Sequence, residues 1–232
     1  VTGNATPRKW TSVEATVASA SVQGVSGLTV TVDTMALQVN RKAADNTLID
    51  YSLTASTTDA ADARNTNLSI ASGPTSSVQM TMNGADGEYT KLTGHLTLNV
   101  FDFVTVSGDF GIEKKQTTVH VADLASTTNV DESAAAINAN VLLIGGNNLS
   151  AFVGASGVGV NLSGMSLGVA LVTEQVTGNA TPRKWTSVEA TVASASVQGV
   201  SGLTVTVDTM ALQVNRKAAD NTLIDYSLTA ST

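Results

Sequence analysis

Apolar residues alternate with small or polar residues along most of the chain. The pattern is clearest in GLTVTVDTMALQVN from Gly27, HLTLNVFDFVTVSGDF from His95 and GVGVNLSGMSLGVALV from Gly157. A period of two that is rich in Val, Leu and Thr is typical of strands with one buried face. We therefore expect an all-β protein with a strand over each of these runs.

Turn-forming residues separate the strand patterns. The run NGADGE from Asn83 predicts a tight reversal, because Asn and Gly tolerate positive φ angles. Only DESAAAINAN from Asp131 has a helical composition, with acidic residues at its start as the helix dipole prefers. An extended loop would have much the same sequence, so both interpretations stay open for this segment.

A perfect repeat divides the chain. Residues 1–57 return unchanged as residues 176–232, so the chain holds one complete period, 1–175, and the start of the next, 176–232. Strands accept many conservative substitutions, so this identity indicates recent duplication within a tandem array rather than a demand of folding. Neither an initiator Met nor a signal-peptide pattern stands at Val1, and we expect an excerpt from a longer protein.

Two architectures agree with the repeat. In an elongated β-solenoid, thin cores of aliphatic residues stack continuously from one period to the next. In tandem β-sandwich domains, each period closes its own core. No Pro-rich or charged linker marks the boundary, which favours the solenoid-like structure, and we expect inter-repeat packing there by two residues and their copies: Pro7, Trp10, Pro182 and Trp185.

Composition and charge limit which residues can form the interior and which partners the chain can bind. Hydrophobic residues make up 42% of the chain but aromatic residues only 4%, which predicts an interior of Val, Leu, Ile and Ala. The net charge of −7 disfavours nucleic acid, because phosphate binding needs clustered Lys and Arg. No stretch approaches the roughly 20 apolar residues of a membrane-spanning helix, so membrane insertion is not expected. Cysteine is absent, which excludes disulfides and thiolate metal sites.

Catalytic groups are sparse. The two histidines, His95 and His120, have no second His or Cys at metal-ligand spacing, and no G-x-S-x-G motif occurs. Asp102 and Asp109 are expected on one strand at an odd separation, which places them on opposite faces. The sequence therefore predicts that the protein is not an enzyme and needs no organic cofactor.

Calcium is the one ligand for which the sequence offers candidates. Asn83, Asp86 and Glu88 crowd the predicted turn and supply the hard oxygen atoms that Ca²⁺ prefers. Asn and Asp are also frequent in turns that bind no metal. The chain contains neither an EF-hand loop nor the glycine-rich nonapeptide G-G-x-G-x-D.

Several blocks carry a family resemblance. HLTLNVFDFVTVSGDFGIEKK from His95, NNLSAFVGASGVGVNLSGMSLGVALVTEQ from Asn147 and PRKWTSVEATVASASVQGVSGLTVTVD from Pro7 resemble the repeat modules of giant RTX-type adhesins, which are very large bacterial surface proteins. The resemblance covers nearly the whole period. It implies secretion to the cell surface and a structural role as an extracellular shaft or filament in adhesion or cell contact.

The same resemblance sets the expected partners. These are neighbouring repeats of the same chain, other copies in a fibre, or a partner cell surface. An adhesin module that binds glycans or a protein partner is the alternative function. Trp10, Tyr51 and Tyr89 are then the candidate sugar-binding aromatic residues, although packing in the core or at a strand edge is the preferred interpretation of all three.

Overall fold

A computed structural model describes residues 7–22, 24–52, 68–123, 136–178 and 180–226. These residues form strands and one short 3-10 helix, and no α-helix occurs among them. The prediction of an all-β protein is confirmed. Within the same ranges, no helix is long and apolar enough to cross a membrane.

The strands differ in length. Some are short, and others are much longer than the usual five or six residues. The elements in chain order are β1 (Thr11–Val17), β2 (Ala20–Val22), β3 (Leu28–Arg41), β4 (Ser69–Ala71), β5 (Ser77–Gln79), η1 (Gly84–Asp86), β6 (Tyr89–Val100), β7 (Val104–Asp123), β8 (Ala136–Ala155), β9 (Val158–Glu174), β10 (Lys184–Gln198), β11 (Thr206–Val207), β12 (Met210–Arg216) and β13 (Thr222–Ile224).

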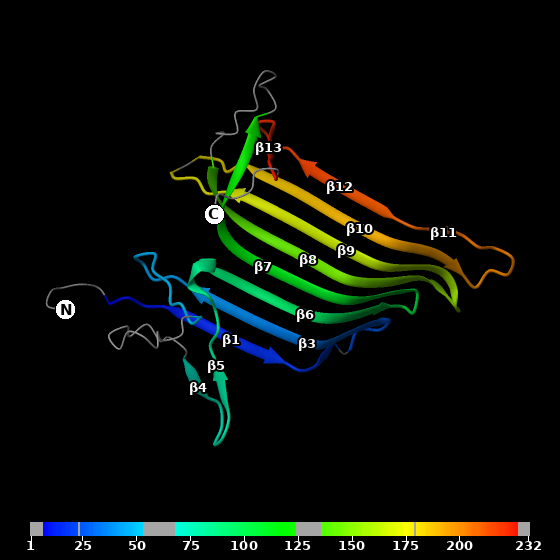
Figure 1. Ribbon diagram of the computed structural model, residues 1–232, viewed down its shortest axis with the longest axis horizontal. Coiled ribbons are helices and arrows are strands. Elements are labelled where there is room, and N and C mark those ends of the chain that lie inside the picture. Colours follow the sequence, from blue (N-terminus) through cyan, green and yellow to red (C-terminus); the bar gives the residue numbers. More distant parts are fainter. Residues whose placement is uncertain (1–6, 23, 53–67, 124–135, 179, 227–232) are drawn as a thin grey trace, which may run out of the picture. The chain divides into compact units, whose positions relative to one another are not determined.

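Hydrogen bonds join eight strands in the order β1-β3-β6-β7-β8-β9-β10-β11, and β4 pairs separately with β5. Three further strands lie off this path, since β2 pairs with β3, β12 with β10 and β13 with β7. Strands β7, β8, β9 and β10 run side by side and antiparallel to their neighbours (Figure 1). Strand β9 follows β8 after only Ser156 and Gly157, which is a two-residue hairpin connection.

Two of the three predicted strand runs are confirmed, by β3 and β9, and the third is divided. The expectation of one strand through Asp102 and Asp109 is wrong, because the chain reverses after Val100 and starts β7 at Val104. Phe101 and Asp102 form the turn with φ angles of 52° and 53°. The Asp102 amide donates to Asn99 Oδ1 at 3.0 Å, which supports a backbone conformation that residues other than Gly rarely adopt.

The helical interpretation of the segment from Asp131 is wrong where the structure describes it. Residues 131–135 lie outside the described ranges, and residues 136–140 form the start of β8. There Ala136 pairs with His120 and Ala139 with Thr117, both on β7. Pairing with a neighbouring strand therefore overrides the helix preference of the Ala-rich sequence.

The chain divides into two compact units. The first comprises Val1–Thr16 and Ala36–Lys91, and the second comprises Val17–Met35 and Leu92–Thr232. In the first unit, the buried cluster consists of Tyr51, Met80, Met82 and Tyr89. In the second unit, it consists of Val121, Ala139, Val141, Val172, Trp185, Ala218 and Ile224. The prediction of an aliphatic interior fits the second cluster apart from its Trp, and it is wrong for the first.

Candidate functional site

The boundary between the two periods is a continuous part of the sheet. Strand β9 ends at Glu174 in the first period and β10 begins at Lys184 in the second. The two strands pair antiparallel from Lys184 opposite Thr173 to Gln198 opposite Gly159. The first strand of the second period is therefore hydrogen-bonded along its length to the last strand of the first.

Trp185 lies at this boundary in a core built by both periods. It is 2% exposed and packs in one cluster with Val121, Ala139, Val141 and Val172 of the first period, and with the second period's Ala218 and Ile224. Its indole Nε1 donates to the carbonyl oxygen of Thr222 at 3.1 Å and to Thr222 Oγ1 at 3.3 Å. The buried ring therefore has hydrogen-bond acceptors for Nε1, its only polar group.

Arg183 adds a charged bridge across the same boundary. Its Nε and Nη2 atoms donate to the two carboxylate oxygens of Glu174 at 2.8 and 2.7 Å, and its Nη1 lies 3.2 Å from Asp220 Oδ2. The guanidinium carbon is 5.2 Å from the centre of the Trp185 ring. Because Arg183 hydrogen-bonds its carboxylate, the pKa of Glu174 is lowered. This two-point geometry is the strongest form of an Arg–carboxylate pair.

The first copy of the repeat forms the same internal bonds with less cover. Trp10 Nε1 donates to the Thr47 carbonyl oxygen at 3.1 Å and to its Oγ1 at 3.2 Å, and Arg8 Nε lies 2.7 Å from Asp45 Oδ2. Trp10 is half-buried, whereas its copy Trp185 is buried. The repeat itself therefore encodes the Trp–Thr and Arg–Asp bonds, while burial of the indole comes from residues of the preceding period.

The two prolines follow the same trend. Pro7 is exposed and its copy Pro182 is half-buried. The role of Pro7, Trp10, Pro182 and Trp185 in packing between periods stays a prediction, and Trp185 has the contacts that such a role requires.

The calcium candidates lie around η1, a single 3-10 turn between β5 and β6 in the first unit. Asn83 Oδ1 accepts the amide hydrogen of Ala85 at 2.8 Å and thereby caps this helix, while Glu88 Oε1 lies 3.4 Å from Arg41 Nη1. Among the described residues, no group of three or more His, Cys, Asp or Glu side chains is arranged to hold a metal ion. Calcium binding at Asn83, Asp86 and Glu88 stays a prediction.

Two of the aromatic residues considered for glycan binding are core residues. Tyr51 is 5% exposed and Tyr89 is 4% exposed, and both pack against Met80 and Met82. Of the two interpretations of these residues, packing is the one that the structure supports. Trp10, the third candidate, keeps an exposed part but uses its Nε1 within the fold.

A row of polar side chains crosses from β6 to β7 in the second unit. His95 Nδ1 is 3.0 Å from Asp109 Oδ1, and His95 Nε2 is 3.3 Å from Ser107 Oγ, which also contacts Thr97 Oγ1 at 3.0 Å. A β-bulge between Ser107 and Asp109 accompanies this arrangement. The hydrogen bond from His95, followed by that from Asn148, lowers the pKa of Asp109.

Asp109 contacts His95 and His95 contacts Ser107, which is the series of contacts found in a catalytic triad. The surroundings, however, are those of a row of polar side chains on the surface of a sheet. The Asp109 side chain is 57% exposed and that of His95 is 39% exposed, whereas the acid of a catalytic triad is buried. Cross-strand hydrogen bonds between Thr, Ser and charged residues are common on the open face of antiparallel sheets. We therefore interpret this row as a stabilising contact within the β6–β7 hairpin.

The chain has no match among known protein families, curated proteins or solved structures. The candidate site at the boundary between the periods therefore rests on the geometry of this chain alone. Sequence reasoning singled out Trp10 and Trp185 but missed their hydrogen-bond acceptors, Thr47 and Thr222. It also missed the pairing of Arg183 with Glu174 and Asp220. No spacing in the sequence marks Thr47 or Thr222 in advance, because two identical copies share every internal spacing.

Proposed function

We propose that the chain is a structural repeat of a very large secreted bacterial surface protein, in which successive periods form an extracellular shaft or filament. One observation carries this proposal. The first strand of the second period, β10, pairs with β9 of the first period along its whole length. Each added period would thus extend the structure by the same strands in the same order, without new chemistry.

The proposed architecture is a series of antiparallel-sheet repeats joined edge to edge. Of the two architectures expected from the sequence, tandem sandwiches suit antiparallel neighbours, whereas stacked solenoid coils place equivalent strands of successive coils next to each other. The ladder between β9 and β10 replaces the linker that separate domains would have. A junction of this kind transmits force through backbone hydrogen bonds, the core around Trp185 and the bridge between Arg183 and Glu174.

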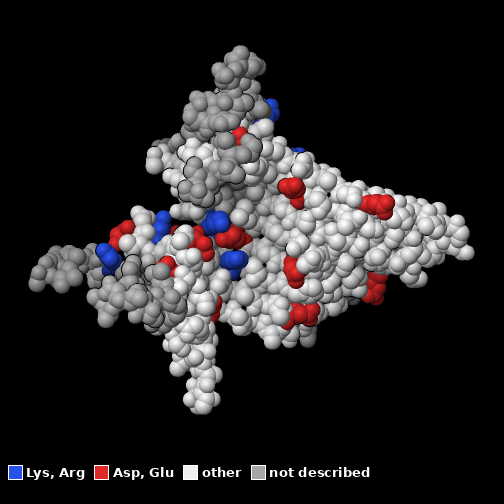
Figure 2. All heavy atoms as spheres, viewed as in Figure 1, with Lys and Arg blue, Asp and Glu red and all other residues white. Residues whose placement is uncertain are grey.

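The surface chemistry supports a passive role outside the cell. On the face shown in Figure 2, the surface over β7 to β10 carries isolated acidic groups and few basic ones. The net charge of −7 opposes lateral association of neighbouring shafts and disfavours nucleic acid as a partner. We propose no catalytic activity and no organic cofactor for the chain.

The resemblance to giant RTX-type adhesin modules supports secretion and a place at the cell surface. It also supports a role in adhesion or cell contact, with neighbouring periods as the first partners. The alternative function, direct binding of glycans by each period, loses two of its three aromatic candidates because Tyr51 and Tyr89 are buried. The structural role is therefore the function that we propose.

Electron microscopy of chains with increasing numbers of complete periods tests the proposal. We expect particles of constant diameter whose length grows by the same increment with each period. A matched series in which a Gly/Ser linker is inserted at the boundary after Gln175 serves as control, and it should give flexible, less regular particles. Compact globules from the unmodified multi-period chains would refute a shaft.

A further inference from the structure

One face of the sheet formed by β7, β8, β9 and β10 is apolar. Directly opposed residues of neighbouring antiparallel strands point to the same face, and two rows of such residues define it. The first row is Ile112, Ile144, Val169 and Val188. The second row, nearer the β8–β9 hairpin, is Val104, Val153, Val160 and Val197. We call this side of the four strands the apolar face.

The sequence keeps apolar residues on this face across an irregular part of the sheet. Strand β9 places even-numbered residues on it up to Leu162 and odd-numbered residues from Met165 onward. Gly164, between them, is skipped in the pairing with β10 and has a φ angle of 59°. A shift of one residue without a matching change in the sequence would turn these side chains to the other face. The bulge and the sequence pattern therefore agree.

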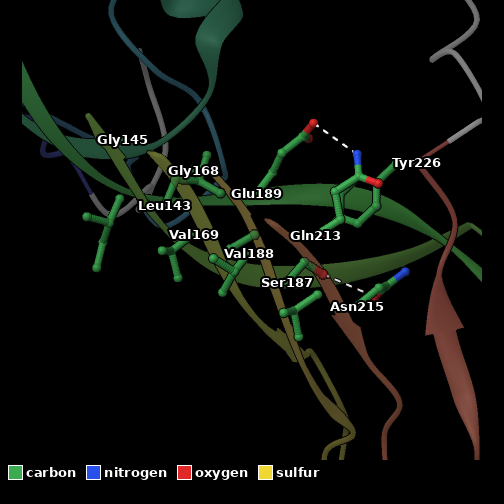
Figure 3. Close-up of a pocket in the computed structure, with 13 residues that line it drawn as sticks. Leu143, Gly145, Gly168, Val169, Ser187, Val188, Glu189, Gln213, Asn215 and Tyr226 are labelled. Atoms are coloured by element: carbon green, nitrogen blue, oxygen red, sulfur yellow. Dashed lines mark hydrogen bonds between the residues drawn. The ribbon is translucent and has the colours of Figure 1, made fainter. Parts of the chain in front are cut away.

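Acidic side chains of the same strands point to the opposite face. Glu189 follows Val188 and Glu113 follows Ile112, and successive residues of a strand alternate between faces. Figure 3 shows Glu189 joined to Gln213 by a hydrogen bond, with Val188 pointing away from that pair. The remaining acidic residues of the four strands alternate in the same way: Asp109, Asp123 and Glu174. No acidic residue of these fully described strands therefore lies on the apolar face.

The apolar face is largely open to solvent. Ile112 is 45% exposed, and Val153, Val160 and Leu171 are 37–39% exposed. All four residues lie on strands that have hydrogen-bonded neighbours on both sides, so their exposure is not that of a sheet edge. A sheet with an apolar face is stable when that face packs against another layer.

Strand β6 widens the apolar face. Its His95 and Thr97 side chains contact Asp109 and Ser107 on the opposite side, so Leu96 between them points to the apolar side. Five strands span about 24 Å, and the two rows that define the face are about 30 Å apart, which gives about 700 Å². A standard protein interface buries about 800 Å² on each partner. The face therefore has about the area that a stable dimer needs.

A hollow of about 150 Å³ lies on the same side of the sheet. Val32, Leu96, Phe110 and Ile112 are among the residues that line it, together with Gly94, which has no side chain to fill it. Side chains of two packed sheets interdigitate across the space between them. The hollow is suited to an apolar side chain of a facing sheet.

We propose that the apolar face is the surface through which two copies of the chain associate, sheet against sheet. A two-fold axis brings the same face of both copies together at the spacing of about 10 Å that is usual for packed sheets. The acidic residues of both copies then lie on the outer faces, where the net charge of −7 on each chain opposes the addition of a third layer. The inference concerns one chain and its copy, and it holds whether or not successive periods form a shaft.

A second copy suits this face better than a polar partner. The two rows that define it offer neither a charge nor a hydrogen-bonding side chain to a glycan or a nucleic acid. The charged residues that these four strands do place on it, Lys114 and Lys184, lie at the end away from the valine row. An identical face matches it in both area and polarity.

Sedimentation velocity of the 232-residue chain over a range of concentrations tests the inference. We expect a monomer–dimer equilibrium with a dimer of twice the chain mass of 23.6 kDa, populated below about 100 μM. Val160→Lys places a charge inside the interface and should weaken association by about 100-fold. Circular dichroism checks that the variant keeps its strands.

The neighbouring residue supplies the matched control. Asn161→Lys adds the same charge to the same strand on the opposite, exposed face, and it should change the dissociation constant by less than about threefold. If Val160→Lys does not fold, Val160→Thr keeps the shape of the side chain and should still weaken association by about tenfold.

Three results would overturn the inference. The first is a chain that stays monomeric at about 100 μM. The second is a dimer that persists unchanged in the Val160 variants, because it would use another surface. The third is equal dissociation by Asn161→Lys and Val160→Lys, because charge alone would then account for the effect.

Discussion

Replacing Trp185 with Ala should destabilise the second unit much more than Trp10→Ala destabilises the first. Trp185 is 2% exposed, and deletion of a buried Trp side chain costs about 3–5 kcal/mol. About 1 kcal/mol of this comes from the hydrogen bond of Nε1 to Thr222. Stacking of Arg183 on the ring adds about 0.5–1 kcal/mol.

Trp10 is an internal control because it has the same neighbours in sequence. It donates the same pair of hydrogen bonds, to Thr47, but it is half-buried. Without cover equivalent to Val141 and Val172, we expect Trp10→Ala to cost about 1–2 kcal/mol. The predicted difference between the two substitutions is therefore about 1–4 kcal/mol.

Urea unfolding followed by far-ultraviolet circular dichroism measures these free energies. Fluorescence of the remaining Trp adds unit-specific information, since Trp10 lies in the first unit and Trp185 in the second. In the Trp10→Ala variant, the Trp185 transition should keep its midpoint. Equal losses for the two Ala variants would refute the reasoning, because they would show that residues of the preceding period contribute nothing to the stability of the boundary.

Three further predictions concern other parts of the chain. Glu174 hydrogen-bonds to Arg183, which lowers the pKa of Glu174 in the folded state. Its contribution of about 0.5–1 kcal/mol to the free energy of unfolding is therefore present above the ordinary carboxyl pKa and is lost as the pH falls through the lowered folded value. In Glu174→Gln, the free energy of unfolding should depend less steeply on pH in the acid range, and an unchanged acid profile would contradict this. Met82→Ala should lower the free energy of unfolding by about 2–4 kcal/mol in thermal unfolding, because Met82 is 1% exposed. Met210→Ala should lower it by under about 1 kcal/mol, because Met210 is 39% exposed. A larger loss for Met210→Ala than for Met82→Ala would refute the assigned cores. A fluorophosphonate probe should leave Ser107 unlabelled, as judged by mass spectrometry, because its hydroxyl belongs to a cross-strand ladder whose Asp109 side chain is 57% exposed. Stoichiometric labelling would contradict a non-catalytic role.

The strands could be predicted well because period-two patterning depends only on which face of a strand is buried. The runs from Gly27 and Gly157 satisfy this condition and form β3 and β9. The run from His95 satisfies it as well but contains a hairpin. Its turn is made by Phe101 and Asp102, without the Gly or Pro that usually marks a reversal, so alternation continued through it in the sequence.

The junction could be predicted only in part. Trp10 and Trp185 stood out because Trp is rare in this chain, yet no pattern within the copies could distinguish them. Their different burial depends on strands that come before each copy, and such contacts between residues far apart in the sequence have no local signal. The row His95, Ser107 and Asp109 was missed for a related reason, since it depends on the unrecognised turn and on the bulge beside Asp109.

The ladder between β9 and β10 has an evolutionary consequence. Insertion or deletion of a whole period by recombination between identical copies would leave each remaining strand beside a neighbour of the same sequence. Gene-length variation would then change the reach of the protein without creating an unpaired strand inside it. A lineage could lengthen or shorten such a molecule in single genetic events, and each product would inherit a ladder like the one that runs from Lys184 to Gln198.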